Sequence, residues 1–166
     1  HSSKIECESV SDFRRSLSKH VPLLRYERSF TMIQLITGKK GSGKTKVIID
    51  KINAAVKNTN GCLVCIEKGE TLRRSISYKV RWCDAEQFCI DSFDSFYGFI
   101  AGMLAGNYDI KEIYVDGILK IAGADFDEFG RMLEKLDKLT GEDSSVTFTV
   151  SADPSELPTS VTRFID

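Results

Sequence analysis

Short apolar runs alternate with helical patterns from Met32 to the end of the chain. The runs that read as strands are 32–37, 62–67, 78–83, 112–117 and 146–151. Apolar residues recur at helical spacing between them, in 44–58, 92–106, 125–139 and, briefly, 158–165. Strands separated by helices predict a parallel sheet with helices on both faces. We therefore expect an α/β fold with a mostly parallel five-stranded sheet between two helical layers.

The residue patterns of two strands predict their positions in the sheet, and the residues at two helix starts predict helix caps. The run CLVCIE is continuously apolar, as in strands buried on both faces, whereas YKVRWC alternates, which favours an edge position. Asp91 or Ser92 is expected to cap the helix over 92–106, whose aromatic stripe is expected to pack in the core. Asp125, with Glu128 three residues later, predicts a capping box.

Residues 1–31 differ from the rest of the chain. Apolar residues at helical spacing in ESVSDFRRSLSKHV predict a short amphipathic helix, but no strand–helix alternation begins before Met32. We interpret 1–31 as an N-terminal extension and 32–166 as the folded domain, with Met32 a candidate start of the native chain. A chain of 166 residues is long enough for one domain with its own core.

Composition limits the environment and the partners. A net charge of −1 gives no overall attraction to nucleic acid or membrane, so nucleic acid is not indicated as a partner. No apolar run approaches the roughly 20 residues of a membrane-spanning helix, so no membrane insertion is expected. Five cysteines without framework spacing are typical of free thiols in a reducing compartment. We expect a cytoplasmic domain.

The segment GKKGSGKT matches the pattern G-x-x-x-x-G-K-[ST] without exception. Its residues are Gly38, Lys39, Lys40, Gly41, Ser42, Gly43, Lys44 and Thr45. It joins an expected strand to an expected helix, whose free N–H groups and positive dipole end attract phosphate. Lys44 is expected to bridge the β- and γ-phosphates, and the Thr45 hydroxyl to ligate Mg²⁺. The absence of a guanine-reading N-K-x-D favours ATP, so the expected cofactors are ATP and Mg²⁺.

On this motif and its strand–helix context, residues 32–166 resemble the P-loop NTPase superfamily. With CIEKGE, SFYGFIAGMLAGNYDI, EIYVDG and FTVSAD, the chain resembles small standalone bacterial ATP-binding proteins sometimes labelled twitching-motility ATPase-like. The resemblance implies a three-layer P-loop NTPase sandwich, of the RecA-like type rather than the kinase–GTPase type. Pilus-retraction ATPases are similar at the phosphate loop and hardly elsewhere, and both histidines here precede that loop.

The resemblance also implies roles for two carboxylates. Asp116, at the end of a strand, matches the Walker B carboxylate that holds Mg²⁺ through water, although Gly117 follows it where motor ATPases keep a glutamate. Glu67 ends its strand where RecA-like members place their catalytic glutamate, so it is the candidate general base. The alternatives are a turn at Asp116 and an ordinary loop carboxylate at Glu67.

Several further polar residues are weaker candidates. Ser151 and Asp153 follow the last strand, where related folds have a γ-phosphate sensor, but Asp153 precedes a proline and equally fits a helix cap. The candidates for stabilising transition-state charge are Arg73, Arg74, Arg131 and Arg163. Lys39 resembles the signature lysine of partitioning-type ATPases. Cys62 and Cys65 have a spacing that turns two thiols of one strand to opposite faces, against a shared metal site.

Three functional classes remain open. The favoured one is an ATP-binding protein that acts as a Mg²⁺-dependent ATPase or nucleotide switch with slow hydrolysis. A small-molecule, nucleoside-like kinase is the alternative, and a regulator that binds without hydrolysing is the third. A protein partner or a second copy of the chain stays open for each.

Overall fold

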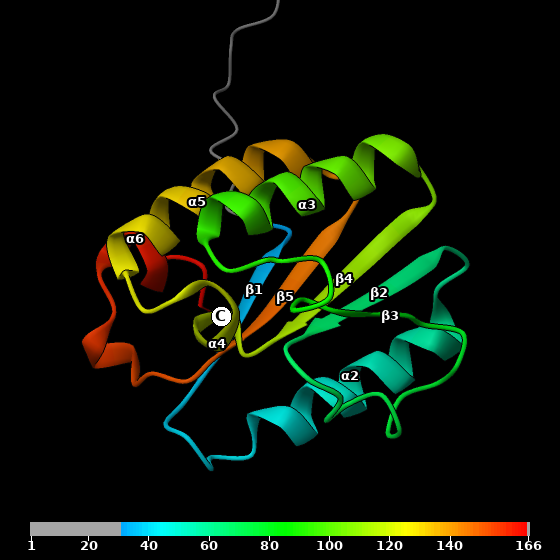
Figure 1. Cartoon of the computed structure of the whole chain (residues 1–166), viewed down its shortest axis with the longest axis horizontal. Helices are drawn as coiled ribbons and strands as arrows, with labels where there is room; N and C mark the ends of the chain where they lie inside the picture. Colours follow the sequence, from blue (N-terminus) through cyan, green and yellow to red (C-terminus); the bar gives the residue numbers. More distant parts are fainter. Residues whose placement is uncertain (1–30, 166) are drawn as a thin grey trace, which may run out of the picture. The chain divides into compact units, whose positions relative to one another are not determined.

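The computed structural model describes residues 31–165, which build a sheet with helices on both faces (Figure 1). Its strands are β1 (Ile33–Thr37), β2 (Cys62–Glu67), β3 (Arg81–Asp84), β4 (Ile110–Asp116) and β5 (Ser145–Val150). All neighbouring pairs are parallel, in the order β1-β5-β4-β2-β3. The expected α/β class and five-stranded sheet are confirmed, and the sheet is wholly parallel. The extension and helix predicted over 1–31 lie, apart from Thr31, outside the described residues.

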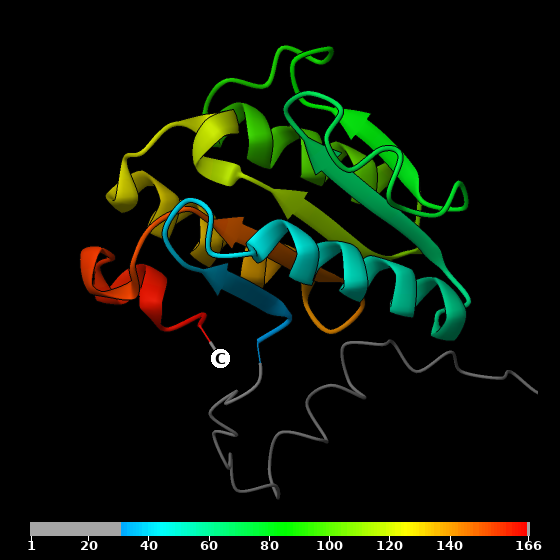
Figure 2. The same ribbon diagram turned by 90° about the horizontal axis from the view of Figure 1, so that it is seen from below.

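Helices cover the two faces unequally. They are α2 (Lys44–Asn58), α3 (Phe93–Gly106), α4 (Ile118–Ala122), α5 (Phe126–Thr140), the 3₁₀ turn η1 (Pro154–Glu156) and α6 (Thr159–Thr162). Figure 1 shows α3 and α5 side by side on one face, and Figure 2 shows α2 crossing the other. No helix among residues 31–165 is long and apolar enough to cross a membrane.

The larger part of the core lies under α3 and α5. Phe93 of α3 stacks on Phe129 of α5 with ring centroids 5.4 Å apart, and Phe129 meets Phe148 of β5 edge-on at 6.0 Å. These contacts confirm that the aromatic stripe of α3 is core packing, because its residues Phe93 and Phe96 are buried. On the opposite face, Ile48 and Ile52 of α2 pack against β2 and β4.

The expected helix caps are present at two starts. The Ser92 hydroxyl accepts a hydrogen bond from the Ser95 N–H at 3.1 Å, and the Ser95 side chain reciprocates. Asp125 accepts from the N–H groups of Asp127 and Glu128, both at 3.1 Å, but among the described residues no return bond to the Glu128 side chain completes the expected capping box. These bonds satisfy N–H groups that have no partner within a helix's first turn.

One expectation about secondary structure was wrong, and one short helix was missed. The strand expected over 78–83 begins only at Arg81, because Ser77 to Val80 form a turn closed by the Val80 N–H on the Ser77 carbonyl at 3.1 Å. Tyr78, placed by the alternation on a strand face, is 93% exposed. The five-residue helix α4 was not expected, since one turn is too short to show a helical period. The edge position of β3 is as predicted.

Candidate functional site

The glycine-rich loop links the end of β1 to the first residue of α2. Gly43 stands at the N-cap of α2 with φ of 90°, a left-handed conformation that glycine adopts without a steric penalty. No side chain caps the helix there, so the first N–H groups of α2 are left for another acceptor. At Gly38 a Cβ atom would collide with the Ser42 hydroxyl, so this position also requires glycine.

Lys44 folds back over the loop that precedes it. Its ammonium group donates to the Lys39 carbonyl at 2.9 Å and to the Ser42 hydroxyl at 3.3 Å. The side chain is only 9% exposed, so its charge is held close to the loop backbone rather than in bulk solvent. An anion seated in the loop would meet a cation that is already positioned.

A cavity of about 480 Å³ opens beside this loop, at the carboxyl ends of β4 and β5. Its size is within the range of small-molecule sites. Its lining residues are Lys40, Gly41, Gly43, Lys44, Thr45, Asp116, Gly117, Lys120, Thr149 and Ser151. Five of the eight predicted loop residues therefore face the cavity together with Asp116, whereas Gly38, Lys39 and Ser42 belong to the loop without lining it.

Asp116 is held in place by Thr149 of the neighbouring strand. The Thr149 hydroxyl donates to Asp116 Oδ1 at 2.7 Å and accepts from the Gly117 N–H, also at 2.7 Å. Thr149 is 2% exposed, so both bonds are shielded from water. Asp116 Oδ2 accepts no hydrogen bond from the residues that the structure describes. Because Asp116 lines the cavity, this oxygen is available to a bound ligand or metal.

The donor set suits a hard cation bound together with phosphate. Thr45 and Asp116 supply a hydroxyl and a carboxylate, the oxygen ligands that Mg²⁺ prefers. Residues 31–165 contain no cluster of three or more acidic, histidine or cysteine ligands that would hold a metal by itself. Mg²⁺ in nucleotide sites keeps several waters and takes phosphate oxygens as ligands, so two protein ligands fit that mode of binding.

Glu67 lies next to Asp116 on the neighbouring strand but is not among the cavity's lining residues. The two residues are register partners on β2 and β4, so both side chains project from the same face of the sheet. Glu67 Oε1 accepts from the Leu72 N–H at 2.8 Å and from Trp82 Nε1–H at 2.9 Å. Burial raises the pKa of this carboxyl above its ordinary value, and the two hydrogen bonds partly oppose that rise.

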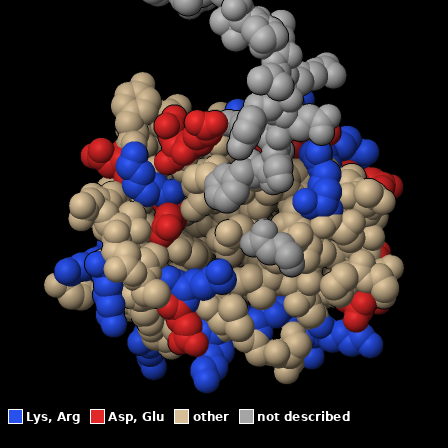
Figure 3. Space-filling model, turned by 180° about the vertical axis from the view of Figure 1, so that it is seen from behind, with Lys and Arg blue, Asp and Glu red and all other residues tan. Residues whose placement is uncertain are grey.

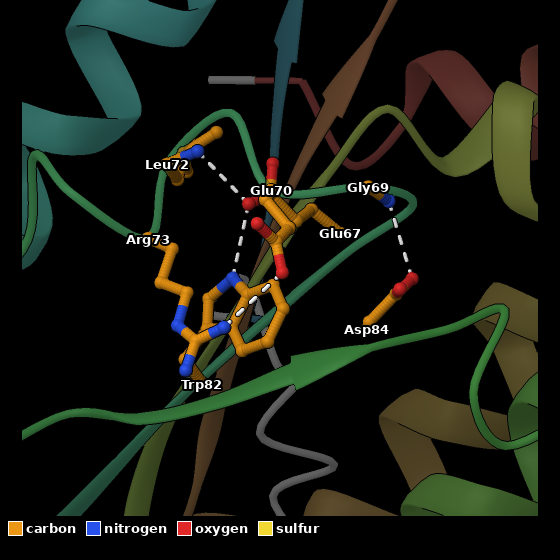
Figure 4. Close-up of polar contacts among 7 residues, drawn as sticks. All are labelled: Glu67, Gly69, Glu70, Leu72, Arg73, Trp82 and Asp84. Atoms are coloured by element: carbon orange, nitrogen blue, oxygen red, sulfur yellow. Dashed lines mark hydrogen bonds and ion pairs between the residues drawn. The ribbon is translucent and has the colours of Figure 1, made fainter.

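The connection between β2 and β3 is fastened around Glu67 (Figure 4). Asp84 Oδ1 accepts from the Gly69 N–H at 3.1 Å, and the Arg73 guanidinium lies 4.7 Å from the centroid of the Trp82 ring. Arg73 also pairs with Glu70 at 3.1 Å. Glu67 is thus a buried anchor for this connection in addition to being a neighbour of Asp116.

The weaker candidates separate clearly. Ser151 lines the cavity, while Asp153 caps η1 by accepting from the Ser155 N–H at 3.0 Å, the alternative weighed for it. Those Ser155 hydrogen bonds lower the pKa of Asp153. Cys62 is exposed and Cys65 buried, on opposite faces of β2. The candidate arginines do not line the cavity: Arg73, Arg74, Arg131 and Arg163.

Sequence reasoning missed two residues of the site. Thr149 lies on β5, between β1 and β4. Its position in the site could not be predicted, because the order of the strands in the sheet is not evident from the sequence. Lys120 comes from α4, the helix that was not expected. Both residues could have been found by the rule that ligands of parallel sheets bind beyond the carboxyl ends of the strands, because Thr149 and Lys120 lie near such ends.

The fold and the site together define the chain as an α/β domain with a glycine-rich loop and a facing carboxylate at one rim of a parallel sheet. No protein-family model matches the sequence, and no curated protein matches it significantly. The function is therefore argued from the chemistry of the site.

Proposed function

We propose that the chain is an ATP-binding P-loop protein of the RecA-like type, a Mg²⁺-dependent ATPase or nucleotide switch with slow hydrolysis. The observation that carries the proposal is the meeting of Lys44 and Thr45 with Asp116 in one cavity. Lys44 and Thr45 are far from Asp116 in the sequence, and the fold brings them together. Each of the three side chains has the chemistry that binding a nucleotide with its metal requires.

The loop supplies the grip on phosphate. The first N–H groups of α2 and its positive dipole end attract the anion, and Gly43 leaves them uncovered. Lys44 would exchange its bonds to the Lys39 carbonyl and the Ser42 hydroxyl for bonds to phosphate oxygens. Lys40 and Lys120 add positive charge to the cavity wall.

Thr45 and Asp116 would hold Mg²⁺, directly and through water respectively. The metal, when bound, neutralises phosphate charge as it develops during transfer. Thr149 contributes by fixing the Asp116 carboxylate, which therefore needs little reorganisation on binding. The two hydrogen bonds of Thr149 also bind β5 to the start of α4, so the metal side of the cavity is rigid.

Glu67 is the proposed general base, in keeping with the RecA-like type. Its register position beside Asp116 and its raised pKa, caused by burial, support a role in accepting a proton. Because Glu67 is 2% exposed and bonded to Trp82 and Leu72, water reaches it only when the β2–β3 connection moves. That requirement accords with slow hydrolysis.

Phosphate release from ATP tests the proposed function. The purified chain with Mg²⁺ should release phosphate without any acceptor, and Lys44→Ala should abolish release. Lys138→Ala, an exposed lysine on α5, is the matched control and should behave as the parent. A nucleoside-like kinase would instead consume ATP only when an acceptor is added, and intact ATP binding and turnover in Lys44→Ala would overturn the proposal.

A further inference from the structure

The net charge of −1 conceals a strong separation of charge along the chain. Residues 38–81 contain eleven Lys and Arg against three Asp and Glu, whereas residues 82–165 contain six against sixteen. The first segment builds α2 and the β2–β3 connection, and the second builds α3, α5 and their loops. Figure 3 shows Lys and Arg gathered along its lower edge, the side on which α2 lies. In this view, Lys and Arg therefore predominate on the side of α2.

We define the basic face by seven exposed cations outside the nucleotide cavity. They are Lys46, Lys51 and Lys57 of α2, and Lys68, Arg73, Arg74 and Lys79 of the β2–β3 connection. Asn53 of α2 joins the two parts, because its amide donates to the Ser75 carbonyl at 3.0 Å and accepts from the Ser77 N–H at 3.2 Å. The cations of α2 and of the connection thus share one surface.

An aromatic side chain stands exposed within the basic face. Tyr78 precedes Lys79 in the β2–β3 connection and is 93% exposed. Among the described residues its ring has no aromatic or cation–π partner. An accessible ring among lysines and arginines is the arrangement by which proteins hold single-stranded nucleic acid, with bases stacked on rings and phosphates on cations.

We propose that the basic face binds single-stranded nucleic acid, with phosphates contacting its lysines and arginines and a base stacking on Tyr78. A single strand fits better than a duplex, because a duplex keeps its bases stacked on one another and offers none to an isolated ring. The acidic side of a second copy would match the charge of the basic face, but would leave Tyr78 without a stacking partner. The site shares no residue with the nucleotide cavity, so it goes beyond the proposed ATPase.

Fluorescence anisotropy with a labelled oligonucleotide of thymidines, and with its uridine counterpart, measures the interaction directly on the full chain without nucleotide. If about five phosphates are contacted, the logarithm of the association constant should fall with the logarithm of salt concentration with a slope of about −3.5. Tyr78→Ala should weaken binding about tenfold at any salt concentration. Arg74→Glu with Lys79→Glu should weaken it more and reduce the slope by about 1.4. The two oligonucleotides distinguish a preference for DNA from one for RNA.

Matched controls lie outside the basic face. Tyr108→Ala removes an 89% exposed ring next to Asp109, and Arg131→Glu with Lys138→Glu makes the same charge change on α5. Both should bind the oligonucleotides as the parent does, and so should Lys44→Ala, which separates this proposal from the proposed ATPase. The exposed positions should leave the fold of the variants intact, and circular dichroism melts check this.

Three results would overturn the proposal. One is the absence of binding by both oligonucleotides at about 50 mM salt, where the electrostatic contribution is large. Another is equal binding by the parent, Tyr78→Ala and the charge-reversed variant. The third is salt-sensitive self-association in sedimentation velocity that Arg74→Glu with Lys79→Glu abolishes and that oligonucleotides do not displace, because a second copy would then occupy the basic face.

Discussion

Thr149→Val isolates the hydroxyl that connects β5 to the carboxylate of the candidate site. Valine keeps the shape of threonine but removes the donor to Asp116 Oδ1 and the acceptor of the Gly117 N–H, both at 2.7 Å. The substitution therefore breaks two hydrogen bonds without opening a cavity. Nothing else in the site is touched, since the Thr149 backbone stays in the sheet.

The two lost bonds have unequal consequences. Asp116 is half-buried, so water can replace the lost bond to its carboxylate. The Gly117 N–H loses its acceptor next to a side chain that is 2% exposed, and an unsatisfied buried donor costs about 1–3 kcal/mol. We expect Thr149→Val to lower the free energy of unfolding by about 2 kcal/mol, or Tm by about 4–8 °C for a domain of this size. With Asp116 no longer fixed, Mg²⁺-dependent ATP affinity should fall about tenfold.

Urea denaturation and ATP titration with and without Mg²⁺ measure the two effects. Thr147→Val is the matched control, because Thr147 lies two residues earlier on the same strand and face and is similarly buried, yet does not bond Asp116. The account of the site requires Thr149→Val to lose more stability than Thr147→Val, and to lose affinity only when Mg²⁺ is present. Equal losses in the two variants, or an unchanged response to Mg²⁺, would refute the reasoning.

Three further predictions concern the same rim of the sheet. Burial raises the pKa of Glu67, so the protonated form is favoured in the fold, and the stability it gives is complete below the ordinary carboxyl pKa and lost as pH rises through the raised value. Glu67→Gln keeps an acceptor for Leu72 and Trp82, so its Tm relative to the parent should be higher at about pH 8 than at about pH 5, and a pH-independent difference would contradict this. Gly38→Ala introduces a methyl group against the Ser42 hydroxyl and should lower both Tm and ATP affinity, whereas Gly98→Ala, with open space on α3, should not lower Tm. Lys120→Ala should weaken ATP binding about three- to tenfold more than it weakens ADP binding if its charge faces the terminal phosphate, and equal effects on both nucleotides would place it elsewhere.

The sequence predicted the architecture because its signals are local and strong. Five apolar runs separated by helical patterns sufficed for a parallel sheet, and the caps at Ser92 and Asp125 fixed two helix starts within a residue. The glycine-rich loop motif predicted the residues on one side of the cavity, and the position of Asp116 at a strand end predicted the carboxylate that faces them. The main error has a non-local cause, because the turn at Ser77–Val80 is bonded to Asn53 of α2, which no short-range pattern reveals.

The features that escaped prediction depend on contacts between distant segments. Thr149 reaches Asp116 only because β5 lies beside β4, and the order of parallel strands is set by the packing of the whole sheet. The burial of Glu67 similarly depends on Trp82 and on the path of the β2–β3 connection. The charge separation was present in the sequence, but an average over the whole chain removed it, and only the fold shows that the cations share a surface.

The most direct test of the central claim is a double-mutant cycle on Mg²⁺-dependent ATP binding. Calorimetric titration of the parent, Thr45→Val, Asp116→Asn and the double variant measures whether the two residues serve one metal–nucleotide complex. If they do, each single variant should lose Mg²⁺-dependent affinity, and the double variant should lose far less than the two losses combined. Independent, additive losses, or ATP binding that none of the substitutions changes, would contradict the site proposed for this protein.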